Sequence, residues 1–242
     1  KFILMNFIAI IPAKEKSTRV PNKNLKVFKG KSLLLHTINQ AKKSKYINKI
    51  YISTDSKKIL KIATNHKIFN SGLRPKKLSG KYASTHSVIK HEIKKIKDNF
   101  KYVIILQPTS PLRTTSDIDK ACRMMIKNKR ADTLVSCSKV PENFLPKKMM
   151  IKEGTFSSFF DFSSIFLNNI KINKIDKKEL LSPPKKLKQE KNLFSRNGAI
   201  YIVKKSKINQ FIIGGKMIIY QMPISRSLDI NTNEDLKKLY LF

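Results

Sequence analysis

The sequence predicts an α/β fold, in which a mainly parallel sheet lies between two layers of helices. Short apolar runs alternate with segments of helical periodicity along most of the chain, and this order is typical of parallel strands joined by crossover helices. A length of 242 residues fits one such domain, or one domain with a sizeable insertion. The hydrophobic fraction of 40% is enough for its core.

Six apolar runs are the expected strands. Each is short and rich in isoleucine, valine or aromatic residues, which favour a pleated, buried surface. They cover residues 7–11, 49–53, 102–106, 133–137, 199–203 and 216–222.

Five segments have the spacing of amphipathic helices, with apolar positions that recur every three to four residues. They cover residues 32–43, 56–66, 84–97, 117–127 and 233–239. Short polar residues that favour N-caps precede the last four of them. The expected caps are Asp55 or Ser56, Ser84, Ser116, and Asn231 or Thr232.

Residues 141–192 interrupt this alternation. The stretch holds four of the ten prolines, a phenylalanine-rich patch at 156–166 and a lysine-rich run at 185–191. We interpret it as a lobe inserted into a single domain that spans residues 1–242. Its apolar side chains suit a subunit interface or a lid, and an irregular cap packed on its own sheet is the alternative.

Lysine and arginine outnumber the acidic residues by 51 to 16, so the formal net charge is +35. The lysines are spread through every segment, and a solvated basic surface therefore explains them better than a nucleic-acid interface. Such a surface attracts nucleotides and acidic sugars.

Two cysteines, Cys122 and Cys137, suggest no disulfide framework and favour the cytoplasm. No apolar run reaches the ~20 residues of a membrane span, so we expect no membrane partner.

A rigid polar loop follows the expected strand at 102–106. It runs Gln-Pro-Thr-Ser-Pro-Leu-Arg from Gln107 to Arg113, and its two prolines fix φ and remove two backbone donors. Gln107, Thr109, Ser110 and Arg113 are thus presented at the carboxyl end of a strand, where open α/β sheets bind ligands. We predict a binding site here rather than an ordinary turn.

A second loop, at residues 12–24, carries Lys14, Lys16, Arg19 and Lys23 at the end of the first strand. Clustered cations there can hold a triphosphate and offset the charge that develops during phosphoryl transfer. The loop is not a Walker A loop, because it lacks the glycine-rich pattern that ends in Gly-Lys-Ser or Gly-Lys-Thr. In a lysine-rich chain, an ordinary basic loop is the alternative.

Asp229 and Asn231 alternate along an extended stretch, so their side chains share one face. Carboxylate and amide oxygens are ligands that suit Mg²⁺ together with phosphate oxygens. We predict that Asp229 is a magnesium ligand and that Asn231 adds a neutral oxygen. Two polar residues ahead of a capped helix are the alternative.

The loop 107–113 resembles the QPTSPLR signature of the acylneuraminate cytidylyltransferases, the CMP-sugar synthetases, and matches it at all seven positions. The resemblance extends over residues 7–240 and is weakest at 145–190. Four further segments resemble family motifs. They are Pro12-Ala13 with Ser17, Pro21, Lys23 and Asn24; Arg74-Pro75 with Leu78, Ala83 and Ser84; residues 196–201, Arg-Asn-Gly-Ala-Ile-Tyr; and residues 225–232, Ser-Arg-Ser-Leu-Asp-Ile-Asn-Thr.

The resemblance implies roles for the residues at these positions. The implied catalytic residues are Lys14, Lys23, Gln107 and Asp229. The implied nucleotide-binding residues are Ala13, Lys14, Ser17, Asn24, Ala83 and Ser84. The implied substrate-binding residues are Gln107, Arg113, Arg196 and Asn197, and the implied metal ligands are Asp229 and Asn231. For Arg113, fixing the loop is the alternative to meeting an anion.

Some positions of the first loop depart from the family pattern. Lys14 stands where the family has arginine, which gives a point charge in place of a bidentate fork. Glu15 and Lys16 replace small residues, and Thr18 replaces a lysine. A glutamate beside a triphosphate repels it unless it points away. A catalytically impaired relative that binds nucleotide is therefore one alternative function.

The resemblance implies a homodimeric cytidylyltransferase that uses CTP and Mg²⁺ to activate an acidic nine-carbon keto-sugar. In this reaction the 2-hydroxyl oxygen attacks the α-phosphorus and pyrophosphate leaves, and positioning and charge neutralisation carry the rate. Sialic, legionaminic and pseudaminic acids are all candidate sugars, and residues 140–144 resemble relatives of the legionaminic type. A basic nucleic-acid-binding protein is the second alternative.

Overall fold

The computed structural model describes residues 7–15, 17, 19–80, 82–145, 150–153, 156–159 and 193–242. The chain divides into two compact units. The first consists of Lys1–Ser138 and Arg196–Phe242, and the second consists of Lys139–Ser195. Among the described residues, no helix is long and apolar enough to cross a membrane.

A seven-stranded sheet forms the centre of the first unit, with strand order β11-β7-β10-β6-β1-β4-β5. β1 pairs in parallel with β4 and β6, β4 with β5, and β7 with β11, whereas β10 pairs with β6 in antiparallel fashion. The predicted mainly parallel α/β fold is confirmed. The strands are β1 (Phe7–Pro12), β4 (Ile47–Thr54), β5 (Phe69–Leu73), β6 (Tyr102–Ile105), β7 (Thr133–Lys139), β10 (Phe194–Lys204) and β11 (Met217–Gln221).

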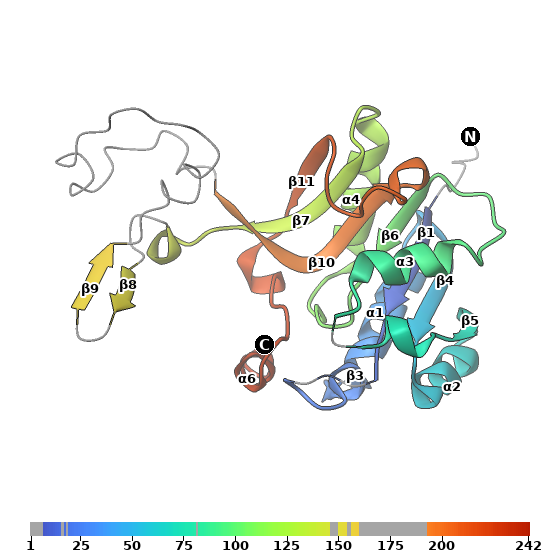
Figure 1. Ribbon diagram of the computed structural model, residues 1–242, viewed down its shortest axis with the longest axis horizontal. Coiled ribbons are helices and arrows are strands. Elements are labelled where there is room, and N and C mark those ends of the chain that lie inside the picture. The colour runs from blue at the N-terminus through green and yellow to red at the C-terminus, as the bar shows by residue number, and fades with distance from the viewer. Residues whose placement is uncertain are drawn as a thin grey trace. The chain divides into compact units, whose positions relative to one another are not determined.

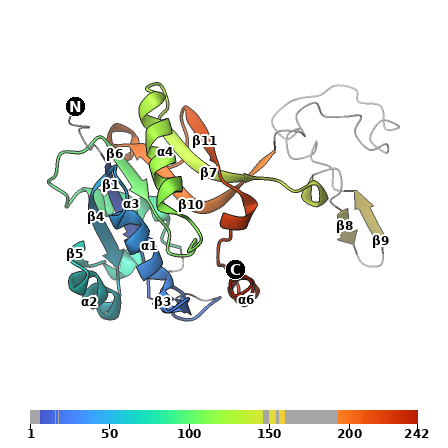
Figure 2. The ribbon, with the colours of Figure 1, turned by 180° about the vertical axis from the view of Figure 1, so that it is seen from behind.

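Helices lie on both faces of this sheet, with α1 and α4 over one face and α3 over the other (Figure 1 and Figure 2). The helices are α1 (Leu33–Lys42), α2 (Lys57–Asn65), α3 (Thr85–Ile93), α4 (Thr115–Lys127) and α6 (Asn233–Leu239). Short 3-10 helices are η1 (Lys23–Leu25), η2 (Lys76–Leu78), η6 (Lys205–Lys207) and η7 (Ile224–Arg226). A small hairpin of β2 (Val27–Phe28) and β3 (Lys31–Ser32) precedes α1.

All six predicted strands occur, but β5 was missed. Its sequence, Phe-Asn-Ser-Gly-Leu, has no apolar alternation, and four of its five residues are exposed. β5 lies at the edge of the sheet beside β4, so tertiary pairing rather than local pattern makes it a strand.

The start of α4 also differs from the prediction. Thr114, not Ser116, is the N-cap, because Thr114 and Asp117 form a reciprocal capping box. The hydroxyl of Thr114 accepts from the backbone N–H of Asp117, and the Asp117 carboxylate accepts from the backbone N–H of Thr114. The other observed caps, Ser56, Ser84 and Thr232, agree with the prediction.

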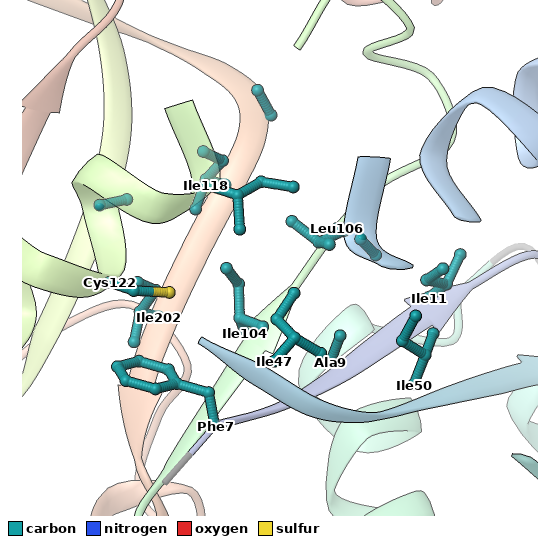
Figure 3. Packing of buried hydrophobic residues seen from close by; sticks show 14 of the residues in the cluster. Phe7, Ala9, Ile11, Ile47, Ile50, Ile104, Leu106, Ile118, Cys122 and Ile202 are labelled. Carbon is teal, nitrogen blue, oxygen red and sulfur yellow. The ribbon is translucent and has the colours of Figure 1, made fainter. Parts of the chain in front are cut away.

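The core packs the sheet against α1 and α4. Phe7, Ala9 and Ile11 of β1 point to this side and pack in one cluster with Ile118 and Cys122 of α4 (Figure 3). Successive strand residues point to opposite faces, and β1 is buried on both. Each such isoleucine or phenylalanine contributes about 1.5–3 kcal/mol when fully buried. Burial raises the pKa of the Cys122 thiol, which suits packing rather than nucleophilic chemistry.

In the second unit the structure describes η3 (Glu142–Phe144) and an antiparallel pair, β8 (Met150–Glu153) and β9 (Phe156–Phe159). The lysine-rich run and most of the phenylalanine-rich patch lie outside the described residues. The inserted lobe, with its interface or lid, therefore stays a prediction.

Candidate active site

A cavity of about 260 Å³ lies where the loops that follow β1, β5 and β6 meet. This is the position expected for a ligand in an open α/β sheet. Its described lining contains the cations Lys14, Arg19, Lys23 and Arg74, and no carboxylate. The cavity is therefore suited to a polyanion. Six predicted site residues line it: Lys14, Ser17, Lys23, Asn24, Ala83 and Gln107.

Hydrogen bonds across the loop hold these cations at the cavity. The Asn24 side-chain amide donates to the carbonyl of Lys14 at 2.8 Å, which ties the two ends of the loop together. Lys23 Nζ donates to the carbonyl of Ile230 at 2.7 Å. Burial lowers the pKa of Lys23; Asp229 opposes this shift, while Arg19 and Lys14 add to it. Lys23 is thus a partly desolvated cation beside Asp229 and two like charges.

Glu15 points away from the cavity. Its backbone N–H donates to Oδ1 of Asp55 at 2.8 Å, and its carboxylate accepts from the hydroxyl of Ser56 at 2.9 Å. Because Ser56 also caps α2, the glutamate is bound to the start of that helix. The repulsion expected between Glu15 and a triphosphate is therefore relieved. Lys16 and Thr18 lie outside the described residues.

Gln107 and Thr109 line the cavity, but Arg113 is buried with 1% of its surface exposed. Its guanidinium donates to the carbonyls of Gln107 and Ala199, at 3.2 and 2.8 Å, and to Oγ1 of Thr37 at 2.9 Å. Burial lowers its pKa to about 10. The substrate-binding role expected for Arg113 is thus corrected, because its donors fix the loop from inside.

The substrate-binding role expected for Asn197 is corrected for the same reason. It is 4% exposed, and its amide oxygen accepts from Oγ of Ser136 at 2.6 Å. Its amide nitrogen donates to Oγ of Ser227 at 2.9 Å. These partners lie inside the protein, so Asn197 joins β7, β10 and the segment after η7. Arg196 beside it is exposed and lies close enough to Tyr201 to lower its pKa, against the larger effect of burial.

Two predicted nucleotide-binding residues lie outside the cavity lining. Ala13 is fully buried, and its N–H donates to the carbonyl of Ser53 at 2.9 Å, which extends the pairing of β1 with β4. Ser84 is the N-cap of α3, and its hydroxyl accepts from the backbone N–H of Ser87 at 3.0 Å. Ser84 therefore orients the helix whose first turn, with Thr85 and Val88, does line the cavity.

Asp229 has a buried carboxylate oxygen, Oδ1, without a hydrogen-bond partner. Its other oxygen accepts from the amide nitrogen of Asn231 at 2.9 Å. A buried, unpaired carboxylate oxygen is costly, and a cation would satisfy it. One carboxylate together with substrate phosphates is a donor set that suits Mg²⁺. Among the described residues, no group of three or more acidic, histidine or cysteine residues is placed to hold a metal.

The metal-ligand role expected for Asn231 is corrected, because Asn231 is a hydrogen-bond partner of Asp229. Its N–H group, rather than its oxygen, is turned toward the Asp229 carboxylate, and its backbone N–H donates to Asp235 at 2.9 Å. The alternation along the chain did bring the two side chains together, but they pair with each other.

Comparison with known proteins agrees with this geometry. The family model described as cytidylyltransferase matches residues 8–238. The chain belongs to the cytidylyltransferase family. The resemblance inferred from residues 107–113 is thereby confirmed.

The names of two curated relatives refer to acidic sugars. The N-acylneuraminate cytidylyltransferase of Streptococcus agalactiae is 29% identical over 96% of this chain and 52% of its own length. The CMP-N,N'-diacetyllegionaminic acid synthase of Legionella pneumophila is 36% identical over 48% of this chain and 52% of its own length. The chain thus spans about half the length of these relatives.

The fold is also shared with a solved structure of another protein. The structure of CMP:2-keto-3-deoxy-manno-octonic acid synthetase complexed with CTP matches with a TM-score of 0.67 at 13% identity, over 97% of each chain. At this identity the likeness concerns the fold alone, and it agrees with the predicted mainly parallel α/β sheet.

Arg74 lines the cavity, although no role was predicted for it. Its side chain is 4% exposed, and its Nε and Nη2 atoms have no hydrogen-bond partner. Nη2 lies 3.7 Å from Oδ1 of Asp55. Burial lowers its pKa, and Asp55 opposes the shift. The sequence signal was the family motif that begins at Arg74-Pro75, but its place at the end of a strand could not be predicted because β5 was missed.

Proposed function

We propose that this protein transfers the cytidylyl group of CTP to an acidic nine-carbon keto-sugar. The 2-hydroxyl oxygen of the sugar forms a bond to the α-phosphorus and gives up its proton. The bond from that phosphorus to the bridging oxygen of the β-phosphate breaks, and pyrophosphate leaves with the electron pair. The main support is the cation-lined cavity together with the unpaired carboxylate oxygen of Asp229, whose charge acts on Lys23 of the cavity lining. The names of the relatives supply the substrate class.

The cations of the first loop would bind the triphosphate. Lys14, Arg19 and Lys23 line one cavity, and their charge would offset the negative charge that accumulates on the leaving pyrophosphate. Asn24 keeps Lys14 in place through its carbonyl. The catalytic contribution of Lys14 and Lys23 is thus electrostatic, with no covalent step.

The other side of the cavity suits the base. Leu78, Ala83 and Val88 provide apolar surface, and Arg74 provides unpaired N–H donors at the same cavity. A planar, polar ring satisfies both, because it stacks on apolar side chains and accepts at its edge. Gln107, at the rim formed by the loop after β6, and the exposed Arg196 are the residues that we assign to the sugar, with Arg196 pairing its carboxylate.

We propose Mg²⁺ as the cofactor, with Asp229 as the protein ligand. Asp229 would hold the ion through its unpartnered Oδ1, and the bound ion would supply positive charge that offsets the charge of the triphosphate and polarises its α-phosphorus. Lys23, whose ammonium is held by the carbonyl next to Asp229, would place the triphosphate beside that carboxylate.

Gly198 makes room for Asp229, and this leads to a test. Gly198 has a φ of 72°, and a Cβ there would lie 2.9 Å from Oδ2 of Asp229. We expect Gly198→Ala to displace this carboxylate and to lower kcat/KM for CTP by about 10–100-fold, as for other changes to the support of a metal ligand. Steady-state kinetics with CTP as the varied substrate measures the effect.

Gly72→Ala is the matched control. Gly72 has a φ of 82°, but no atom lies within 4 Å of a Cβ built there. The two variants therefore share a strained backbone that costs about 1–3 kcal/mol, and only Gly198→Ala adds the contact with Asp229. Equal losses of activity in both would show that strain alone is responsible.

The quaternary structure is proposed from the resemblance, and the location is proposed from the two cysteines, which suggest no disulfide framework. We propose a homodimer that acts in the cytoplasm. Light scattering of the purified protein after size-exclusion chromatography measures the mass in solution, and a monomer at micromolar concentration would contradict the proposal.

The proposed activity is tested by measuring pyrophosphate release with CTP, Mg²⁺ and a panel of sialic, legionaminic and pseudaminic acids. We expect release with CTP and one of these acids, and at least tenfold slower release with ATP, GTP or UTP, because a base that does not pair with the buried donors of Arg74 leaves them unsatisfied. Folded protein that binds CTP but releases no pyrophosphate with any acid would instead support the impaired relative.

A further inference from the structure

The segment that carries Asp229 starts at an edge of the sheet. β11 is the outermost strand, and β7 and β10 lie between it and β6. The chain between β11 and α6, which can be followed in Figure 2, must therefore return across the ends of two strands to reach the loops around the cavity. A metal ligand on such a segment works only if other contacts hold it to within about 0.5 Å.

Asp117 is the residue on which this returning segment converges. It is fully buried and lies in the first turn of α4, directly after the loop 107–113. Arg226 donates to it twice, from Nε to Oδ2 at 3.0 Å and from Nη2 to Oδ1 at 2.8 Å. The hydroxyl of Tyr220 donates to Oδ1 at 3.0 Å. Tyr220 precedes Pro223 and Arg226 follows it, so the Asp117 carboxylate binds the chain on both sides of this proline.

The Asp117 carboxylate is itself rigidly held. Oδ2 also accepts from the backbone N–H and the hydroxyl of Thr114, at 3.0 and 2.7 Å. Burial disfavours its charged form, but the hydrogen bonds from Arg226, Thr114 and Tyr220 outweigh burial and hold its pKa at about 2. The fork between Arg226 and Asp117 is therefore ionised at any working pH, and its planar geometry fixes direction as well as distance.

Further contacts extend this attachment to the cavity. The N–H of Ile230 donates to the carbonyl of Thr109 at 2.8 Å, and the carbonyl of Ile230 accepts from Lys23. Thr109 and Lys23 both line the cavity. Asp229 thus lies between two fixed points, the fork three residues before it and the paired backbone of the residue after it.

We propose that Asp117 and Arg226 are positioning residues that hold Asp229 at the cavity and thereby set the affinity for magnesium-bound CTP. The inference rests on the proposed function, since it takes Asp229 as the metal ligand. It adds that the bidentate geometry, beyond the charge of Arg226, is required. A pair that only stabilised the fold would affect unfolding without affecting magnesium-dependent binding.

Calorimetric titration of CTP into Arg226→Lys, in Mg²⁺ and in EDTA, tests this. The lysine keeps the charge but loses the fork. We expect the wild type to bind CTP more tightly in Mg²⁺ than in EDTA. In Arg226→Lys we expect about tenfold or greater weakening in Mg²⁺ and binding within about twofold of wild type in EDTA. The rate constant kcat should fall in parallel.

Two control variants separate positioning from stability. Tyr220→Phe removes one hydrogen bond to Asp117 but leaves the fork. The magnesium-dependent gain, meaning the increase in CTP affinity from EDTA to Mg²⁺, should therefore stay close to that of the wild type. Asp98→Asn breaks the ion pair with Lys49, 2.6 Å long and formed by residues that do not line the cavity, so it should lower the Tm and leave the gain intact.

The outcomes distinguish this inference from the proposed function. If Arg226→Lys lowers the Tm but keeps the full magnesium-dependent gain, the pair is only structural and the inference is overturned. If wild-type protein shows no such gain, the magnesium site itself is wrong and the inference falls with it. Pyrophosphate release by the wild type then still decides the transferase activity separately.

Discussion

Replacing Asp229 with asparagine is expected to lower kcat/KM for CTP by roughly 10²–10³-fold, the loss typical of removing one electrostatic contact to a transition state. The amide keeps the shape of the side chain and removes the negative charge beside Lys23. Because Oδ1 of Asp229 has no partner within the described protein, the variant loses no hydrogen bond at that atom. The free energy of unfolding should therefore change little or rise.

This combination of lost activity and kept stability is the decisive feature. Steady-state kinetics and urea unfolding of the same preparation measure both quantities. Asp119→Asn is the control, since Asp119 is also an acidic residue in a hydrogen-bonded position, and its partners are Ser44, at 2.6 Å, and Lys45 rather than a residue of the cavity lining. Full activity in Asp229→Asn would remove the metal ligand from the mechanism.

Arg113→Met is expected to cause the largest loss of stability. The methionine fills much of the space but donates nothing, so the carbonyls of Gln107 and Ala199 lose a buried donor. Each buried group left unsatisfied costs about 1–3 kcal/mol, so we expect the free energy of unfolding to fall by about 3 kcal/mol. Urea unfolding followed by circular dichroism measures it.

Arg123→Met is the matched control, because Arg123 is exposed on α4 and surface changes usually stay within about 0.5 kcal/mol. Arg113→Lys adds a second test. A lysine keeps the charge but cannot reach the two carbonyls and Thr37 with one planar group, so its stability should lie between wild type and Arg113→Met. Equal stability of Arg113→Met and wild type would contradict the role assigned here to the buried guanidinium.

The first loop shows how contacts decide what a departure from a family pattern means. Glu15 was expected to repel a triphosphate unless it pointed away, and hydrogen bonds with Ser56 and Asp55 hold it. Those partners are about forty residues away in the chain, and only the pairing of β1 with β4 brings them to Glu15. The composition of the loop could not reveal this orientation.

The buried polar residues show the same limit. Arg113 and Asn197 have the chemistry of substrate-binding residues, and both lie in motifs next to the cavity. Their partners are Ala199, Thr37, Ser136 and Ser227, which come from other strands and helices. A polar side chain that finds such partners contributes to the fold, whereas Nε and Nη2 of Arg74 have no hydrogen-bond partner beyond the 3.7 Å contact with Asp55, which leaves donors for a ligand.

The sequence by itself determined the strands with apolar runs, the helices with capped starts, and the polar loops 12–24 and 107–113 at the ends of two strands. These features are local, since hydrophobic period, proline and capping residues act within a few positions. The tertiary structure alone decided that β5 is a strand, that Arg74 faces the cavity, and that Asp117 holds the segment of Asp229. In each case the partners are distant in the chain. Only the folded core decides which polar groups find hydrogen-bond partners inside the protein and which can bind a ligand.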